Sequence, residues 1–138
     1  MRRNSVPLKV ILLVTALVYA QVVGFGFADY DDILLLTGNP TAHGLSWNNI
    51  TTAFTTYDPE LYVPLTLLSY QIEYSLARLE PWIYHATNLA LHLLAVWLLF
   101  WIVTKLAEQK GRELQAPWIA ALVAGVFALH PLNVQSVA

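Results

Sequence analysis

The chain has 138 residues, of which 57% are apolar and only 12% are charged. A soluble domain carries about 25% charged residues, and small domains bury the smallest share of their surface, so this composition argues against a soluble enzyme and against disorder. The net charge of −2 excludes a nucleic-acid binder with a basic face, and the lack of cysteine excludes disulfides and thiolate metal sites. We therefore expect an integral membrane protein.

Three apolar segments have the length, or nearly the length, that crosses a bilayer. About twenty residues at about 1.5 Å rise each span the hydrocarbon core as a helix. Pro81 and Pro117 stand where helices begin, because the first helical turn does not use the missing N–H. The predicted fold is all-α and integral to the membrane, with about three transmembrane helices, at residues 8–28, 84–106 and 117–131.

The basic residues set the predicted orientation, because short loops rich in lysine and arginine stay on the cytoplasmic side. They are Arg2, Arg3 and Lys9 at the first span and Lys105, Lys110 and Arg112 between the second and third. The N-terminus is therefore predicted inside and the acidic loop of residues 29–83 outside. A signal peptide cleaved after Ala20 is the alternative for the first segment, but the apolar stretch continues past Ala20, which favours an uncleaved span.

The outer loop is too long and too apolar to be a plain linker. Ser46 has the side chain of a helix N-cap, which predicts a short helix over residues 47–55. A second helix is predicted over residues 61–79, and aromatic residues, which prefer the headgroup level, crowd the loop. We expect both to be surface helices, lying along the membrane. The alternative, a span over residues 61–79, puts the basic loop outside, which the charge rule disfavours.

Several polar residues are predicted to lie near the outer ends of the spans. Asp31 and Asp32 follow the first span, and adjacent like charges beside a low-dielectric medium retain a proton or recruit a cation. The pair is therefore a candidate base or metal ligand, or else a solvated helix exit. His85, Asn88 and His92 share one helical face, where they mark a functional site or bond to a neighbouring helix.

Two further residues belong to the same outer side. His130 ends the third span, as a helix terminus or a ligand. Arg78 is the only lysine or arginine of the outer loop, where it meets a phosphate or pairs with Glu73 or Glu80. Because the histidines and the acidic pair fall at one depth on one face, we predict that they converge.

Five short segments occur in an order that resembles a known family. They are YDDILLLTGNP, ITTAF, YVPLTLLSYQIEYSL, PWIYHATNLALHLL and FALHPLNVQSVA. Together they resemble the N-terminal part of the transmembrane and tetratricopeptide-repeat proteins, a group of GT-C type glycosyltransferases that includes protein O-mannosyltransferases. The resemblance covers nearly the whole chain from residue 29 to residue 138.

The resemblance implies an activity and a site. Such enzymes move a sugar from a polyprenyl-phosphate donor to a hydroxyl acceptor, on a protein or lipid, at the outer or lumenal face. Their catalytic acidic pair lies in the first outer loop, where this chain has Asp31 and Asp32, which also offer a place for a divalent cation. The expected substrate-binding residues are His85, Asn88, His92, Arg78 and His130.

The family continues through more spans than this chain holds, and no tetratricopeptide repeat is present. We therefore expect the N-terminal part of a longer enzyme, inactive alone, in a bacterial inner membrane rather than the endoplasmic reticulum. Membrane lipids are further expected partners. The alternative is a non-enzymatic membrane protein whose outer loop binds a partner or lipid. An ion carrier is disfavoured, because the cytoplasmic halves of the spans lack ionisable groups.

Overall fold

The computed structural model describes residues 5–28 and 31–137. Arg2, Arg3 and Asp29 lie outside the described residues. The residues that it describes form helices and connecting turns without a β-strand, so the all-α prediction is confirmed. The chain divides into two compact units, which we call the span unit (residues 1–23 and 85–138) and the loop unit (residues 24–84).

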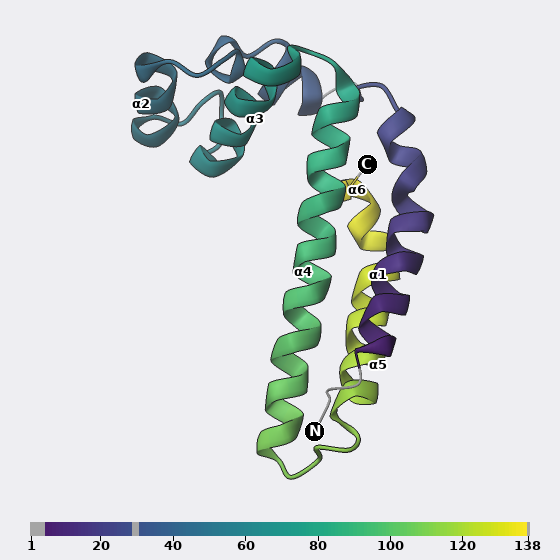
Figure 1. The fold of residues 1–138 in the computed structure, drawn as a ribbon. Coiled ribbons are helices and arrows are strands. Elements are labelled where there is room, and N and C mark those ends of the chain that lie inside the picture. Colours follow the sequence, from purple (N-terminus) through teal and green to yellow (C-terminus); the bar gives the residue numbers. More distant parts are fainter. Residues whose placement is uncertain (1–4, 29–30, 138) are drawn as a thin grey trace. The chain divides into compact units, whose positions relative to one another are not determined.

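Three long helices make up most of the span unit (Figure 1). They are α1 (Val6–Tyr19), which the 3-10 helix η1 (Ala20–Gly24) continues, α4 (Pro81–Gln109), which enters the unit at His85, and α5 (Ala116–Leu129). The 3-10 helix η4 (Pro131–Asn133) and α6 (Val134–Val137) follow α5. Val6–Gly24 and α4 are long and apolar enough to cross a membrane, and α5 with the following helices, bent by 52°, makes a third span if counted as one.

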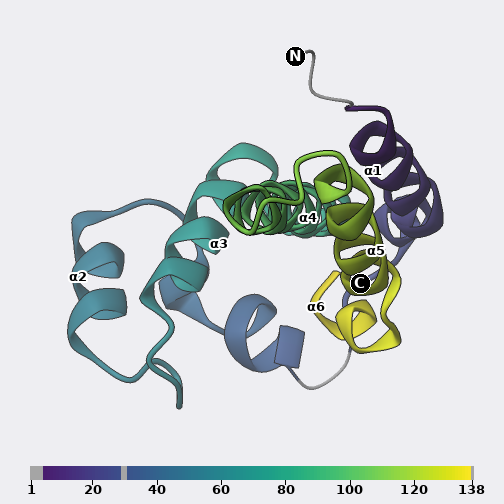
Figure 2. The same ribbon diagram turned by 90° about the horizontal axis from the view of Figure 1, so that it is seen from below.

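The helices of the span unit pack through a stripe of alanines on α5. Every fourth residue of α5 is alanine, and these four side chains are fully buried: Ala116, Ala120, Ala124 and Ala128. Small residues at this spacing let neighbouring helices approach closely in a membrane. Val96 and Phe100 of α4 pack on this stripe together with Leu8 and Ile11 of α1. Seen along the helices, α5 lies between α1 and α4 (Figure 2).

The observed helix ends differ from the predicted ones for local reasons. The first helical segment ends at Gly24, before residue 28, where Gly24 and Gly26 weaken a helix. The second begins at Pro81 and continues past residue 106 to Gln109. Lys105 and Glu108 face each other one turn apart, with Nζ and Oε2 3.1 Å apart, so the helix continues with polar residues beyond its apolar part.

Among the described residues of the loop unit, four helical segments lie between the acidic pair and α4. They are the π-helix η2 (Ile33–Thr37), the 3-10 helix η3 (Pro40–Ala42), α2 (Trp47–Thr55) and α3 (Pro64–Ala77). The Ser46 hydroxyl accepts a bond from the Asn49 N–H at 3.1 Å, so the predicted cap of α2 is confirmed, with the predicted bounds. Leu36, Ala42, Ala53, Leu67 and Tyr84 form the buried core of this unit.

Helix α3 is shorter than the prediction of residues 61–79. Pro64 stands in its first turn, and Arg78 ends it with a φ of 58°, a conformation that breaks the helical run. Its 14 residues fall short of the roughly 20 that cross a bilayer. That α3 lies along the membrane surface stays a prediction.

We predict that Glu60 is outside and Glu113 is inside, because the basic residues flank the turn that carries Glu113. The chain has no cysteine of its own, so single cysteines report accessibility cleanly. In sealed vesicles of known orientation, an impermeant maleimide should label Glu60→Cys from the outer side and Glu113→Cys only after lysis. The reverse pattern would overturn this orientation.

Candidate functional site

The acidic pair stands at the start of the first helical turn of the loop unit. Asp31 is exposed, whereas Asp32 is half-buried. The Oδ2 atom of Asp32 accepts a hydrogen bond from the Ala28 N–H, with 2.6 Å between the two atoms. Within the described residues, the side chain of Asp31 has no hydrogen bond or ion pair. One carboxylate therefore holds the backbone in place, and the other is open to solvent.

A single turn of π-helix follows the pair directly. The Gly38 N–H donates to the carbonyl of Ile33 at 2.8 Å, which is the five-residue spacing of a π-helix. A Cβ atom on Gly38 would lie 2.7 Å from that same carbonyl oxygen, closer than real Cβ contacts allow. Only glycine therefore fits, and Gly38 fixes the turn that presents Asp31 and Asp32. Such isolated π turns occur frequently at functional sites.

Helix α3 brings a phenol and a third carboxylate toward the pair. Burial raises the pKa of Tyr70, and the negative charges of Asp32, Glu73 and Asp31 raise it further, in that order. Glu73 itself is only 4% exposed. The phenol therefore stays protonated near three carboxylates, and the arrangement combines an exposed acceptor, Asp31, with a neutral O–H donor.

Aromatic contacts hold the end of α3 in the loop unit. The ring of Tyr70 makes an edge contact with Tyr84, with centroids 5.9 Å apart, and Tyr84 makes another with Phe27 at 5.4 Å. The Tyr84 hydroxyl donates to the Arg78 carbonyl at 2.7 Å. This bond satisfies a carbonyl that the end of a helix leaves without an intrahelical partner.

Arg78 differs from the expected ion pair with Glu73 or Glu80. Within the described residues its guanidinium has no ion pair and lies 5.3 Å from the ring centroid of Tyr74. His43 also stacks on Tyr74, with centroids 4.6 Å apart and planes 11° apart. A cation–π contact of this kind leaves the guanidinium hydrogens accessible to an anion.

Two histidines of the span unit, His92 and His130, make hydrogen bonds through their rings, and His85 makes none within the described residues. His92 is buried, with Nε2 3.0 Å from the Ala128 carbonyl, so it joins α4 to α5. The Nδ1 atom of His130 accepts a bond from the Leu132 N–H at 3.2 Å and caps η4. His85 is only 4% exposed, and neither of its ring nitrogens has a partner in the part of the chain that the structure describes.

The predicted site residues thus fall into both units. Asp31, Asp32 and Arg78 belong to the loop unit, and the four others, His85, Asn88, His92 and His130, belong to the span unit. Their convergence stays a prediction. Over residues 5–28 and 31–137, no group of three or more histidine, aspartate or glutamate side chains is arranged to hold a metal ion, and a divalent cation on the acidic pair stays a prediction.

Sequence reasoning missed two residues near the acidic pair, Tyr70 and Glu73. The signal was present, because they stand three positions apart within the predicted helix over residues 61–79 and so share a face. A carboxylate in a largely apolar helix is costly to bury unless it has partners, which marks it for attention. In the same helix, Gln71 is fully buried, and neither of its amide atoms has a partner among the described residues.

Comparison with known proteins finds distant similarity to protein O-mannosyl-transferases. Over 129 residues, which make up 88% of this chain, it is 30% identical to protein O-mannosyl-transferase tmtc2 of Xenopus laevis. It is 33% identical over 54% of its length to protein O-mannosyl-transferase Tmtc1 of Drosophila melanogaster, and 28% identical over 79% to TMTC1 of Homo sapiens. The chain spans only 8–14% of the length of these relatives.

No family model matches the chain, and no solved structure matches it. The three likenesses support the resemblance to the transmembrane and tetratricopeptide-repeat family, and together with the apolar helices they support a membrane protein. All three relatives come from animals, so the comparisons give no support to a bacterial inner membrane.

We expect Gly38→Ala to loosen the segment that carries the acidic pair, because the new Cβ meets the Ile33 carbonyl. An overpacked methyl group costs about 1–3 kcal/mol, which corresponds to about 5- to 150-fold faster amide exchange when opening is local. Hydrogen-exchange mass spectrometry of residues 31–43 measures this. Gly26→Ala is the control, because nothing lies within 4 Å of its Cβ position. Equal exchange in both variants would contradict the role of Gly38.

We also expect Asp32→Asn to lower the pKa of Tyr70 toward its ordinary value of 10.0, because the phenolate then forms near one negative charge fewer. Asp31→Asn should lower it less. Carbon-13 NMR of labelled tyrosine, assigned with Tyr70→Phe, follows the titration. The control is Glu60→Gln, an exposed carboxylate that makes no contribution to this pKa. A Tyr70 titration that none of these variants moves would show that the pair lies elsewhere.

Proposed function

We propose that this chain is part of a membrane glycosyltransferase that moves a mannosyl group from a polyprenyl-phosphate donor to a hydroxyl of a protein at the outer or lumenal face. The observation that carries the proposal is the asymmetry of the acidic pair: Asp32 is bound to the backbone, and Asp31 is exposed and open. The similarity to protein O-mannosyl-transferases supports the sugar and the acceptor.

Asp31 has the properties of a general base. A hydroxyl is a poor nucleophile until a nearby group removes its proton, and an exposed carboxylate accepts that proton as the oxygen attacks. The new bond joins the acceptor oxygen to the anomeric carbon of the sugar, while the bond between that carbon and the phosphate oxygen breaks. The proton goes to Asp31, and the polyprenyl phosphate leaves with the electron pair.

Asp32 serves as a positioning residue in this scheme. Its bond to the Ala28 N–H closes the backbone around the pair, and the Gly38 turn closes it on the other side. A base held in a fixed place loses less entropy on reaching the transition state than one on a mobile loop. The two neighbouring carboxylates therefore have different tasks.

Hydrogen-bond donors for the leaving phosphate come from the remaining site residues. The Tyr70 hydroxyl stays protonated because the carboxylates oppose its ionisation. The Arg78 guanidinium retains its hydrogens on an exposed side chain. Donors aimed at developing negative charge are a major source of catalysis in transfer reactions.

The test is sugar transfer by the full-length protein from a polyprenyl-phosphate mannose to a protein acceptor. Asp31→Asn should lower the rate by about 10²–10⁴-fold, which is the usual contribution of a general base. Asp32→Asn should lower it less, because an asparagine oxygen still accepts from the Ala28 N–H. Glu60→Gln, which removes an exposed loop carboxylate outside the site, is the control.

Near-normal transfer by both aspartate variants, at unchanged expression, would end the catalytic role of the pair. If the full-length protein transfers no sugar, with or without the substitutions, the result would favour the alternative, a non-enzymatic membrane protein whose outer loop binds a partner.

A further inference from the structure

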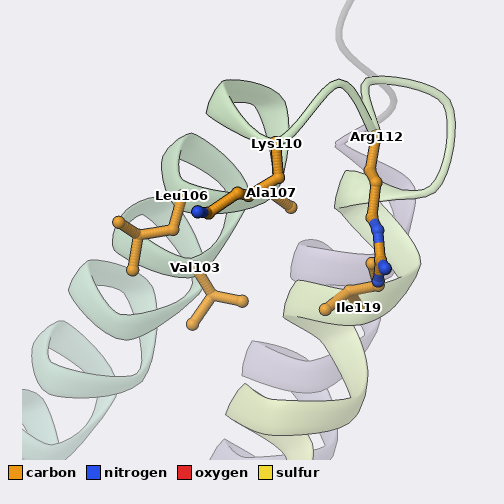
Figure 3. Close-up of a pocket in the computed structure, with 6 residues that line it drawn as sticks. All are labelled: Val103, Leu106, Ala107, Lys110, Arg112 and Ile119. Carbon is orange, nitrogen blue, oxygen red and sulfur yellow. The ribbon is translucent and has the colours of Figure 1, made fainter.

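A pocket of about 520 Å³ opens in the span unit where α4 turns into α5 (Figure 3). Its walls are largely apolar, and two cations stand among them; the lining residues are Val103, Leu106, Ala107, Lys110, Arg112 and Ile119. All six come from the end of α4, the turn, and the start of α5. None of them belongs to the acidic site in the loop unit.

The shape of the turn brings the two cations to the same pocket. The Arg112 N–H donates to the Ala107 carbonyl at 3.1 Å, and the Gly111 N–H donates to the Glu108 carbonyl at 3.0 Å. These two bonds, with Gly111 at a φ of 70°, form a Schellman motif, which reverses the chain at the end of a helix. In Figure 3 the Lys110 side chain lies back along α4, and the Arg112 side chain extends down beside Ile119.

Both cations are available to a ligand. Within the described residues, neither the Lys110 ammonium nor the Arg112 guanidinium takes part in a hydrogen bond or an ion pair. The nearby Glu108 pairs with Lys105 instead, with 3.1 Å between Nζ and Oε2. Two uncompensated positive charges therefore border an apolar pocket.

The position of the turn selects the class of ligand. Helix α4 is apolar enough to cross a membrane, so its last turn lies at a membrane face, among lipid headgroups. Guanidinium binds phosphate oxygens through two parallel hydrogen bonds, and lysine adds a point charge. The apolar side chains of Val103, Leu106 and Ile119 match the start of an acyl chain. Basic pockets between membrane helices are known lipid-headgroup sites.

We propose that this pocket binds an anionic phospholipid, with the phosphate on Arg112 and Lys110 and the first acyl carbons on the apolar wall. The role goes beyond sugar transfer, because it concerns the opposite end of α4 from Pro81 and a ligand that is not consumed. The bound lipid would neutralise the turn and fix the register of α4 against α5.

The experiment is native mass spectrometry of the full-length protein in neutral detergent, titrated with phosphatidylserine. Lys110→Gln and Arg112→Gln should each weaken the tightest lipid-binding event by about fivefold, since each basic residue near a lipid surface contributes about that factor. The matched control is Lys105→Gln, which removes the same charge from the same region outside the pocket, and it should change binding less than twofold.

Two further arms keep the result interpretable. Arg112→Lys retains the charge but loses the two parallel hydrogen bonds, so its affinity should lie between that of the unchanged protein and that of Arg112→Gln. Thermal unfolding confirms that each variant folds. Phosphatidylcholine with the same acyl chains should bind more weakly than phosphatidylserine. Three results would each overturn the proposal. They are equal affinity for both lipids, a loss of affinity in Lys105→Gln equal to that in Lys110→Gln and Arg112→Gln, and displacement of the lipid by equimolar glycerophosphoserine, which lacks acyl chains.

Discussion

The need to satisfy every backbone N–H and C=O group within the membrane is the constraint on which this protein depends. In hydrocarbon, an apolar chain segment meets that need as a helix, and the helix interior then leaves no group free for chemistry. Polar groups are left over only at helix ends, where four donors or four acceptors have no intrahelical partner. Two sets of hydrogen bonds lie at such ends, the bond between Arg78 and Tyr84 and those of the turn at Gly111, whereas His92 bonds to α5 from within α4.

The two acidic residues illustrate how neighbouring side chains of one type acquire different roles. Asp32 lies partly inside the loop unit and holds the Ala28 N–H, so its geometry serves the backbone. Asp31 points to solvent and keeps its accepting capacity. The phenol of Tyr70 and the buried Glu73 come from α3, far along the chain, and the negative charges of Asp32, Glu73 and Asp31 oppose ionisation of that phenol. The catalytic role that we propose for the pair rests on the contrast between these environments.

Small residues and polar residues both contribute to helix packing in the span unit. Fully buried alanines on α5 let the helices approach, and His92 adds a directional bond to the Ala128 carbonyl. The hydroxyl groups of Thr15 and Thr104 bond to carbonyls four residues earlier on their own helices, so they are buried without loss. His85 is the exception among the described residues of the span unit, because its buried ring has no partner for either nitrogen.

The sequence alone determined the helical membrane fold, because long uncharged segments permit no other structure in a bilayer. It also determined local features that depend on near neighbours, such as the Ser46 cap and the start of α4 at Pro81. Helix α5 ends at Leu129, before the predicted end at residue 131. Only the tertiary structure showed that Tyr70 and Glu73 lie near the acidic pair, that Arg78 lies on Tyr74, and that His92 bonds to α5. It also placed Lys110 and Arg112 on one pocket. The contacts of Tyr70 with the acidic pair and of His92 with α5 join residues that lie far apart along the chain, so no periodic signal predicts them, and they depend on how turns such as those at Gly38 and Gly111 redirect the backbone.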